Sequence, residues 1–420
     1  MRRPEHVYVR LSAAAAFAGT LAFSITNIYR FATAGLSPFQ LVIVGTAMEA
    51  AVFVAEIPTG VVADLFSRKW SVIVGHAGIG LALLVEASFA SFAGVLVAQI
   101  LWGVMYTFTS GATEAWLAGE MGEPDSAALG KVFFRASRWS TIVTVVAVPL
   151  SLSLGTVSLR LPIVLAGVCQ LGLVVYLLFA MKEQHFEPAG DSDRSNWHRF
   201  AGTVRDGLGV VRRSRTLMLL AVVIAVAGGS SEAYDRYRER HLLTDVGVPE
   251  WFGRDPLVTL AVLFTASSLI GVFVAWWMER HVDRRGPAVR RWLVWLILAQ
   301  SVALVVFSLT GSFAIAAVAL VVVDRTRSVR SKLFASWIIP LTPKAQRATV
   351  LSALEQCDSV GQVTVGPAMG VIGGVWSVPA SLVTSAVVLA PAAAVVRRAQ
   401  AASTATTTPT TTPTTTPPVT

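Results

Sequence analysis

Long apolar stretches recur along this 420-residue chain and constrain its fold more than any other feature. A helix needs about 20 mostly apolar residues to cross the hydrocarbon core of a bilayer. The sequence predicts such helices at 8–32, 38–61, 70–91, 93–117, 130–155, 161–181, 215–235, 257–278, 290–310, 312–336, 349–373 and 377–397. We therefore expect an all-α membrane protein with twelve transmembrane helices.

The composition agrees with a membrane protein and excludes a soluble one. Apolar residues make up 54% of the chain, charged residues make up 14%, and the mean hydropathy is +0.64. A soluble domain has about 25% charged residues, which keep its surface wet. Disorder, a coiled coil and a secreted disulfide scaffold are likewise excluded for the body of the chain.

The basic residues set the expected orientation. The net charge is +9, but Lys and Arg gather in short clusters between the apolar stretches. They form no basic stripe with interleaved aromatic residues, so we expect no nucleic-acid partner. Clusters of this kind hold loops in the cytoplasm. Here they fall mainly in the loops that lie on the same side of the membrane as the N-terminus. We expect a multi-pass plasma-membrane protein with both termini in the cytoplasm.

A long basic linker at 182–214 divides the chain into two halves of six helices. We expect an N-terminal bundle at 1–181 and a C-terminal bundle at 215–398. Within the linker, apolar residues at helical spacing alternate with arginines, which is typical of an amphipathic helix on a membrane surface. A regulatory or partner-binding segment is the alternative. The Thr/Pro-rich stretch 399–420 has the composition of a disordered tail.

The loop after the second predicted helix carries the most specific motif, EIPTGVVADLFSRK. Gly60 lets a neighbouring backbone approach the helix end, and Asp64 can meet a helix N-terminus or a basic side chain. The chain here resembles the major facilitator superfamily, whose signature is matched in order by Gly60, Asp64, Arg68 and Lys69. Ser67 stands where the family usually has a second glycine. The resemblance implies a conformational-switch loop that latches the two halves together; a loop serving topology alone is the alternative.

The resemblance extends over about residues 8–397. Asp283, Arg284 and Arg285 form a weaker echo of the first loop, as parallel six-helix repeats predict. Phrases such as GLSPFQLVIVGT and SSEAYDR resemble bacterial twelve-helix drug-efflux-like permeases. The resemblance implies two six-helix bundles around a central cavity, with a small-molecule substrate and protons as partners.

Carboxyl groups inside the predicted helices are candidates for proton coupling. An ionisable side chain costs about 2.5–3.5 kcal/mol to insert at the centre of a membrane helix, so its presence suggests a function. Glu49 lies near the middle of the second helix, and Glu56 lies two turns further on nearly the same face. A carboxyl group among apolar neighbours binds protons more readily, as a proton-coupled carrier requires. Glu49 is the first candidate, followed by Glu56 and Asp358; a structural hydrogen bond is the alternative for Glu49.

Further charges at membrane depth are candidates for a substrate cavity or for structural ion pairs. They are Glu114, Arg138, Glu232, Asp235, Asp324 and Arg325. We expect a structural ion network around Glu114 and Arg138. Arg325 and Asp358 lie at similar depth on neighbouring segments and can pair, either facing the cavity or only satisfying each other.

Small residues in the second half suggest close packing or a broken helix. Gly366 and Gly370 lie one turn apart on the eleventh predicted helix and give it a smooth packing face, while Pro367 bends it. On the seventh helix, Gly228–Gly229 is a place where the helix can break and open its backbone to a cavity.

Enzyme chemistry finds no support in the sequence. There is no HExxH or GxSxG motif, and no GxxxxGK[ST] loop for an ATP-driven pump. Cys169 and Cys357 lie far apart in apolar segments and are expected to be packing residues rather than metal ligands. We expect no cofactor and no metal; a membrane-embedded enzyme or sensor is a remote alternative.

The sequence favours a monomeric secondary transporter that exports small amphipathic or drug-like compounds in exchange for protons by alternating access. The alternative is a symporter that imports a small metabolite with protons. Drug–proton antiporters of the superfamily have a Gly-Pro motif in helix five, whereas this chain has Pro149 without a preceding glycine. That departure weakens the inference to antiport but not the inference to transport.

Overall fold

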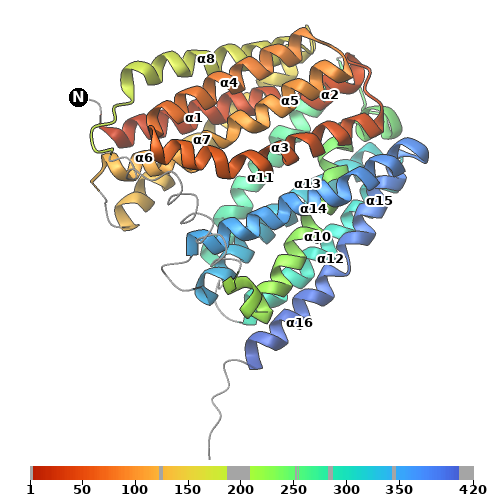
Figure 1. The fold of residues 1–420 in the computed structure, drawn as a ribbon. Coiled ribbons are helices and arrows are strands. Elements are labelled where there is room, and N and C mark those ends of the chain that lie inside the picture. The colour runs from red at the N-terminus through yellow and green to blue at the C-terminus, as the bar shows by residue number, and fades with distance from the viewer. Residues whose placement is uncertain are drawn as a thin grey trace, which may run out of the picture.

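The computed structural model describes residues 3–122, 126–186, 209–250, 253, 255–281, 287–342 and 347–405. Within these residues all regular structure is helical. The helices form two bundles, one from each half of the chain, that lie side by side at an angle (Figure 1). The all-α, two-bundle architecture predicted from the sequence is therefore confirmed.

The N-terminal bundle contains α1 (Pro4–Phe23), α2 (Thr26–Ala32), α3 (Pro38–Leu65), α4 (Arg68–Ser88), α5 (Phe92–Thr107), α6 (Ala112–Glu120), α7 (Ser126–Gly155) and α8 (Leu161–Ala180). Two predicted spans are each split into two helices, α1–α2 and α5–α6. The second split falls at Gly111, whose φ of +71° is in the left-handed region that favours glycine. α3 begins with a capping box in which the Ser37 hydroxyl accepts from the Gln40 backbone and the Gln40 side chain accepts from the Ser37 backbone.

The C-terminal bundle contains α10 (Arg215–Arg240), a π-helical turn η1 (His241–Val246), α11 (Pro256–His281), α12 (Pro287–Leu309), α13 (Phe313–Ile338), a short 3₁₀ turn η3 (Ile339–Leu341), α14 (Arg347–Val375), α15 (Val378–Leu389) and α16 (Ala392–Ala405). α10 runs past the predicted end at 235 because its charged residues form ion pairs instead of ending the helix. α10 is also unbroken at Gly228–Gly229, so the expected helix break there is wrong.

Ten spans in the described part of the chain are long and apolar enough to cross a membrane. The remaining two predicted spans, 312–336 and 349–373, correspond to α13 and α14, which are long enough but carry several charges. Most of these charges face the other helices or a cavity between the bundles, as described below. Membrane helices tolerate ionisable groups when these face the protein interior.

The two bundles pack against each other at one end, where α3 contacts α10 and α14, and α7 contacts α11. Apolar residues of both bundles share one buried cluster there. The Tyr237 hydroxyl donates to the Pro38 carbonyl at 2.7 Å, and the Asn27 amide donates to the Asp235 carbonyl at 2.8 Å. We call this end the sealed face, and the opposite end, which carries Pro4, the terminal face.

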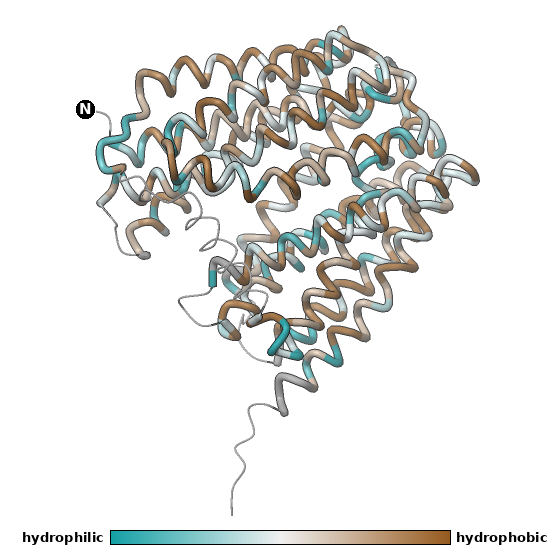
Figure 2. The backbone as a smooth tube through the Cα atoms, viewed as in Figure 1, coloured by the Kyte–Doolittle hydropathy of each residue, from teal (hydrophilic) through white to brown (hydrophobic). Residues whose placement is uncertain are grey.

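Hydrophobic residues cover most of the length of each helix (Figure 2). Hydrophilic residues gather at the helix ends and on the side of the C-terminal bundle that faces the other bundle (Figure 2). Many large apolar side chains are exposed on the outside of the bundles, including Phe179, Val157, Val318 and Val302. Such an exterior suits lipid rather than water.

Parts of the predicted domain organisation lie outside the described residues. These parts are most of the linker with its expected amphipathic helix, the echo loop with Asp283, Arg284 and Arg285, and the tail from 406 to 420. α16 continues to Ala405, so the first residues of the expected tail are helical.

Candidate functional site

A cavity of about 690 Å³ lies between the two bundles. α3, α5 and the turn after α5 form one wall, and α10, α13 and α14 form the other. The bundles diverge toward the terminal face (Figure 1), and the cavity lining reaches Ile338, the last residue of α13, and Leu351, near the start of α14. The charged residues that line it are Glu49, Glu56, Arg327, Arg330, Glu355 and Asp358.

The three predicted proton-coupling candidates all line this cavity. Glu49 and Glu56 project from α3 seven residues apart, which places them on nearly the same side of the helix. The Ser359 hydroxyl donates across the bundles to Glu49 Oε2 at 3.4 Å, and the Ser110 hydroxyl donates to Glu56 Oε1 at 3.4 Å. Both carboxylates are half-buried and have neutral hydrogen-bond donors.

Asp358 faces the cavity from the opposite wall, on α14. The Gln362 amide donates to Asp358 Oδ2 at 2.8 Å. A Cβ at Gly228 would lie 2.4 Å from the Asp358 carbonyl oxygen, so α10 and α14 approach at backbone distance here. Gly228 therefore serves helix packing, which fixes the position of Asp358.

Arg327 and Arg330 are the two cations in the cavity wall, and both are partnered. Arg327 forms a bidentate ion pair with Asp235, at 2.5 and 2.8 Å. Arg330 is buried, and its Nη1 donates to Gln300 Oε1 at 2.6 Å. The predicted site includes Asp235 but not these arginines, although their spacing of three residues places them on one side of α13.

Glu232 and Asp324 lie behind the cavity wall rather than in it. Glu232 is fully buried, its Oε1 pairs with Arg236 at 2.9 Å, and its Oε2 has no hydrogen-bond partner. Asp324 accepts a hydrogen bond from the Tyr234 hydroxyl at 2.9 Å and lies 3.8 Å from Arg238. Both carboxylates hold α10 and its neighbours in place.

Arg325 lies on another side of α13, next to Gly271 of α11. It lines a separate pocket of about 280 Å³ together with Lys332. Within the described residues no ion pair joins Arg325 to Asp358, so the pairing considered from the sequence is not formed. Two residues along a helix correspond to a rotation of about 200°, so Arg325 and Arg327 point in nearly opposite directions.

Two aromatic side chains of α5 also line the cavity. The rings of Trp102 and Tyr106 stack with centroids 5.2 Å apart and an interplanar angle of 8°. Phe23 packs edge-on against Trp102 and supports the stack. Nothing in their sequence spacing separates these rings from ordinary packing aromatics.

The motif loop between α3 and α4 contacts its own bundle. Arg68 pairs with Asp64 at 3.2 Å and donates to the Ala115 carbonyl at 3.2 Å. The Glu183 carboxylate accepts from the Ser67 hydroxyl and from the backbone N–H groups of Arg68 and Lys69 at 2.9 and 3.1 Å. Glu183 thus caps the positive end of α4. The Asp64 side chain is 58% exposed, and among the described residues its ion pair is with Arg68 of its own bundle.

Gly60 leaves room around the end of α3, since a Cβ there would meet nothing within 4 Å. Glu114 and Arg138 are exposed side chains near the terminal face. Among the described ion pairs none includes either of them, so the expected ion network around them is not formed.

The predicted packing glycines lie where α14 crosses α3. A Cβ at Gly366 would lie 2.9 Å from Thr46 Oγ1, and a Cβ at Gly370 would lie 3.2 Å from Val42 Cβ. Pro367 lies inside α14, which continues through it. The small residues therefore allow the close contact that closes the sealed face.

One buried ion pair of the N-terminal bundle escaped the sequence analysis. Arg30 Nε pairs with Glu86 Oε1 at 2.7 Å, and both side chains are 1% exposed or less. The Gln99 amide donates to Glu86 Oε2 at 2.6 Å, and the Tyr29 hydroxyl donates to the Glu86 carbonyl at 2.9 Å. An ionisable residue within a predicted span, Glu86, was the signal available for it.

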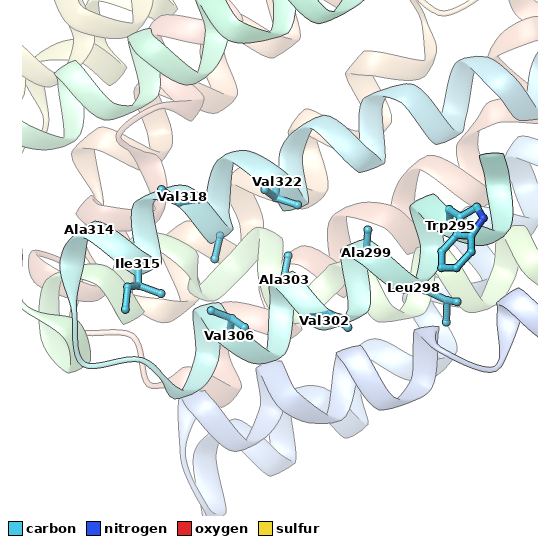
Figure 3. Close-up of a pocket in the computed structure, with 11 residues that line it drawn as sticks. Trp295, Leu298, Ala299, Val302, Ala303, Val306, Ala314, Ile315, Val318 and Val322 are labelled. Carbon is cyan, nitrogen blue, oxygen red and sulfur yellow. The ribbon is translucent and has the colours of Figure 1, made fainter. Parts of the chain in front are cut away.

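An apolar groove of about 760 Å³ lies between α12 and α13 (Figure 3). Trp295, Val302 and Val318 line it, and all three are largely exposed. The lining carries no charged side chain, so the groove suits a lipid chain rather than a selective site. Within the described residues no group of three or more His, Cys, Asp or Glu side chains could hold a metal ion.

Comparison with known proteins identifies the family. The model of the Major Facilitator Superfamily matches residues 11–324. The chain belongs to this superfamily. As a superfamily member it is a multi-pass membrane protein and a secondary transporter of small molecules, not an enzyme. A related protein, the uncharacterized MFS-type transporter YxaM of Bacillus subtilis (strain 168), is 21% identical over 360 residues, covering 83% of this chain and 84% of YxaM.

Several solved structures share the fold of this superfamily member. The nucleoside transporter NupG superposes with a TM-score of 0.72 at 15% identity, covering 96% of this chain and 99% of NupG. A POT family transporter in complex with a thioalcohol-conjugated peptide gives 0.74 at 12% identity, with 97% of each chain covered. A bacterial homolog of the human lysosomal transporter Spinster, in an inward-facing and occupied conformation, gives 0.74 at 14% identity, covering 95% and 96%. These likenesses establish the fold.

Proposed function

We propose that this superfamily member exports small amphipathic compounds in exchange for protons, by alternating access through the cavity between its bundles. The observation that carries the proposal is the cavity itself. It lies where the two bundles diverge from the sealed face, and Glu49, Glu56 and Asp358 line it. A space of about 690 Å³ is within the range of small-molecule sites.

In this proposal the terminal face is cytoplasmic, so the structure is the inward-facing state. Rocking of one bundle against the other closes the terminal face and opens the sealed face. The loop with Gly60, Asp64, Arg68 and Lys69 serves as the switch. Its exposed Asp64 engages the C-terminal bundle only after the bundles close at the terminal face.

Glu49 is the proposed proton carrier. It lines the cavity, and it accepts a hydrogen bond from Ser359 of the other bundle. Protonation that weakens or strengthens this contact shifts the balance between the two states, because a ligand acts through its differential affinity for them.

The test uses purified protein in liposomes that enclose a pH-sensitive dye, with an imposed proton gradient. The compounds added are lipophilic cations, tetracycline-like and macrolide-like compounds, sugars, amino acids, nucleosides and peptides. We expect an amphipathic compound to dissipate the gradient, and Glu49→Gln to abolish that flux while the protein stays folded. Glu250→Gln is the matched control, because it removes the charge of an exposed carboxylate that does not line the cavity.

Two results would contradict the proposal. Normal coupling in a stably inserted Glu49→Gln protein would remove Glu49 from the proton path. A labelled compound that moves in the same direction as the protons would replace export with the second candidate, proton-coupled uptake of a metabolite. That candidate draws its support from the fold neighbours described as nucleoside and peptide transporters.

A further inference from the structure

The charges in the cavity wall are out of balance. Four lining side chains are carboxylates: Glu49, Glu56, Glu355 and Asp358. Within the described residues none of the four takes part in an ion pair. The side-chain hydrogen bonds described for them come from neutral donors, namely Ser359, Ser110 and Gln362.

The two lining arginines do not restore the balance. Arg327 is neutralised by Asp235, which lies outside the lining and binds it with both oxygens. Arg330 is buried, and it donates a hydrogen bond to the neutral Gln300. The cavity therefore presents an excess of negative charge to whatever enters it.

The same wall offers a flat apolar surface beside these carboxylates. Trp102 and Tyr106 form a parallel stack, and Phe23 packs edge-on against Trp102. The Tyr106 ring is 41% exposed, so part of it is free to contact a ligand. Aromatic faces attract cations as well as planar rings.

Two other pockets have different chemistry. The groove between α12 and α13 has no charged residue in its lining, and the pocket between α11 and α13 holds Arg325 and Lys332 without a lining carboxylate. Of these three pockets, the central cavity is the one that combines negative charge with stacked aromatic rings.

From this geometry we infer that the substrate is an organic cation with a planar aromatic part, which stacks against Trp102 and Tyr106 while its charge lies among Glu49, Glu56 and Glu355. The inference rests on the proposed function and names its substrate class. It also explains how the substrate is exchanged for protons. A cation is held best by ionised carboxylates, so its binding displaces the protons that these groups carry, and the cation and the protons occupy the cavity by turns.

A binding experiment on the purified full-length protein tests the inference without transport. The probes are three planar molecules of similar size: N-methylacridinium, which is a permanent cation; acridine, which is neutral at mildly alkaline pH; and acridine-9-carboxylate. We expect N-methylacridinium to bind at least about tenfold more tightly than the other two, equivalent to about 1.4 kcal/mol. We also expect its binding, unlike that of acridine, to release protons into a weakly buffered solution.

Variants locate the site. Glu56→Gln and Glu355→Gln should each weaken N-methylacridinium binding by roughly three- to tenfold and leave acridine binding unchanged, since only the cation feels the lost charge. Trp102→Ala should weaken the binding of both N-methylacridinium and acridine. Glu250→Gln is the charge-matched control outside the cavity.

Equal or tighter binding of acridine-9-carboxylate would overturn the inference, as would glutamine variants that affect the three probes alike. The outcomes separate the two proposals. Proton-coupled flux of a neutral or anionic compound, with no binding of the cation, would overturn the substrate class alone. Selective cation binding by a protein that moves no compound against a gradient would overturn the transport mechanism alone.

Discussion

The Arg30–Glu86 pair and the cavity carboxylates are all ionisable groups within membrane-spanning helices, but their surroundings differ. Arg30 and Glu86 enclose each other at 2.7 Å and are 1% exposed or less. Glu49 and Glu56 each accept a hydrogen bond from a serine hydroxyl and face a cavity. The charges of Arg30 and Glu86 neutralise each other inside the fold. The cavity carboxylates have no such counter-ion among the described residues, so they can still bind a proton or a cation.

This contrast separates two reasons for a charge at membrane depth. A buried pair fixes the packing of its helices, and loss of either partner leaves a charge in a medium of low dielectric constant. A carboxylate without a cation partner is open to a proton or a ligand. Removal of its charge is expected to change binding and to leave the fold intact.

The largest expected effect comes from Arg30→Met. The substitution keeps the length of the side chain but leaves Glu86 buried without its counter-ion. Breaking such a pair typically costs about 3–5 kcal/mol, so little folded protein should remain. Size-exclusion profiles and thermal unfolding in detergent check this, with Glu49→Gln alongside. The contrast would break if both variants had the same unfolding temperature.

Two glycines of α14 allow a similar comparison for helix packing, one within a bundle and one between the bundles. Gly361 lies inside the C-terminal bundle, and a Cβ there would lie 1.9 Å from the Ala225 carbonyl oxygen. Because the obstacle is backbone, Gly361→Ala should lower the free energy of unfolding by about 1–3 kcal/mol. Thermal unfolding measures the change. Wild-type stability in this variant would mean that α10 and α14 are further apart than described.

Gly366→Ala should act on the balance of states instead. Its Cβ would press on Thr46 Oγ1 of the other bundle at 2.9 Å and on Glu232 Cγ at 3.1 Å. Both obstacles are side chains that can move, so we expect a stability change below about 1 kcal/mol. Opening of the sealed face should speed maleimide labelling of a Val42→Cys reporter, a position that is fully buried here. An unchanged labelling rate would show that Gly366 does not control closure.

The smallest effect is expected at Glu183, a carboxylate of a third kind. It is bound to the N-terminal N–H groups of α4 near the terminal face. Glu183→Gln keeps its shape and removes the charge that interacts with the helix dipole, a change of about 0.3–1 kcal/mol. Thermal unfolding at low salt provides the measurement, with Glu250→Gln as control. A loss of stability as large as that of Arg30→Met would contradict the small helix-capping role assigned to Glu183.

The sequence predicts more of the fold than of the site. Apolar runs mark where helices cross a bilayer, so all twelve spans correspond to helices, including the charged α13 and α14. Hydropathy does not report which way a side chain points. Arg325 was chosen as a candidate while Arg327, two residues on, lines the cavity. Helical periodicity separates the two arginines, but only tertiary packing decides which one faces the other bundle.

The partners of charged residues were also beyond the sequence. Arg30 and Glu86 are far apart along the chain, and their contact depends on how α2 packs on α4. Glu114 and Arg138 lie closer along the chain, yet they form no ion pair in the structure as described. Proximity in sequence is a poor guide to ion pairing between separate helices.

The central claim is that the bundles must part at the sealed face for transport to occur. A Cβ at Gly374 would lie 3.3 Å from Phe39 Cβ across the bundles, close to the 3.5–4.5 Å spacing that a disulfide requires. The most direct test is a Phe39→Cys/Gly374→Cys protein with Cys169 and Cys357 replaced by serine, assayed in liposomes with a compound that the wild type moves. We predict that oxidation stops the flux, that a reductant restores it, and that neither single-cysteine protein responds. Undiminished flux through a fully cross-linked protein would contradict alternating access by these two bundles.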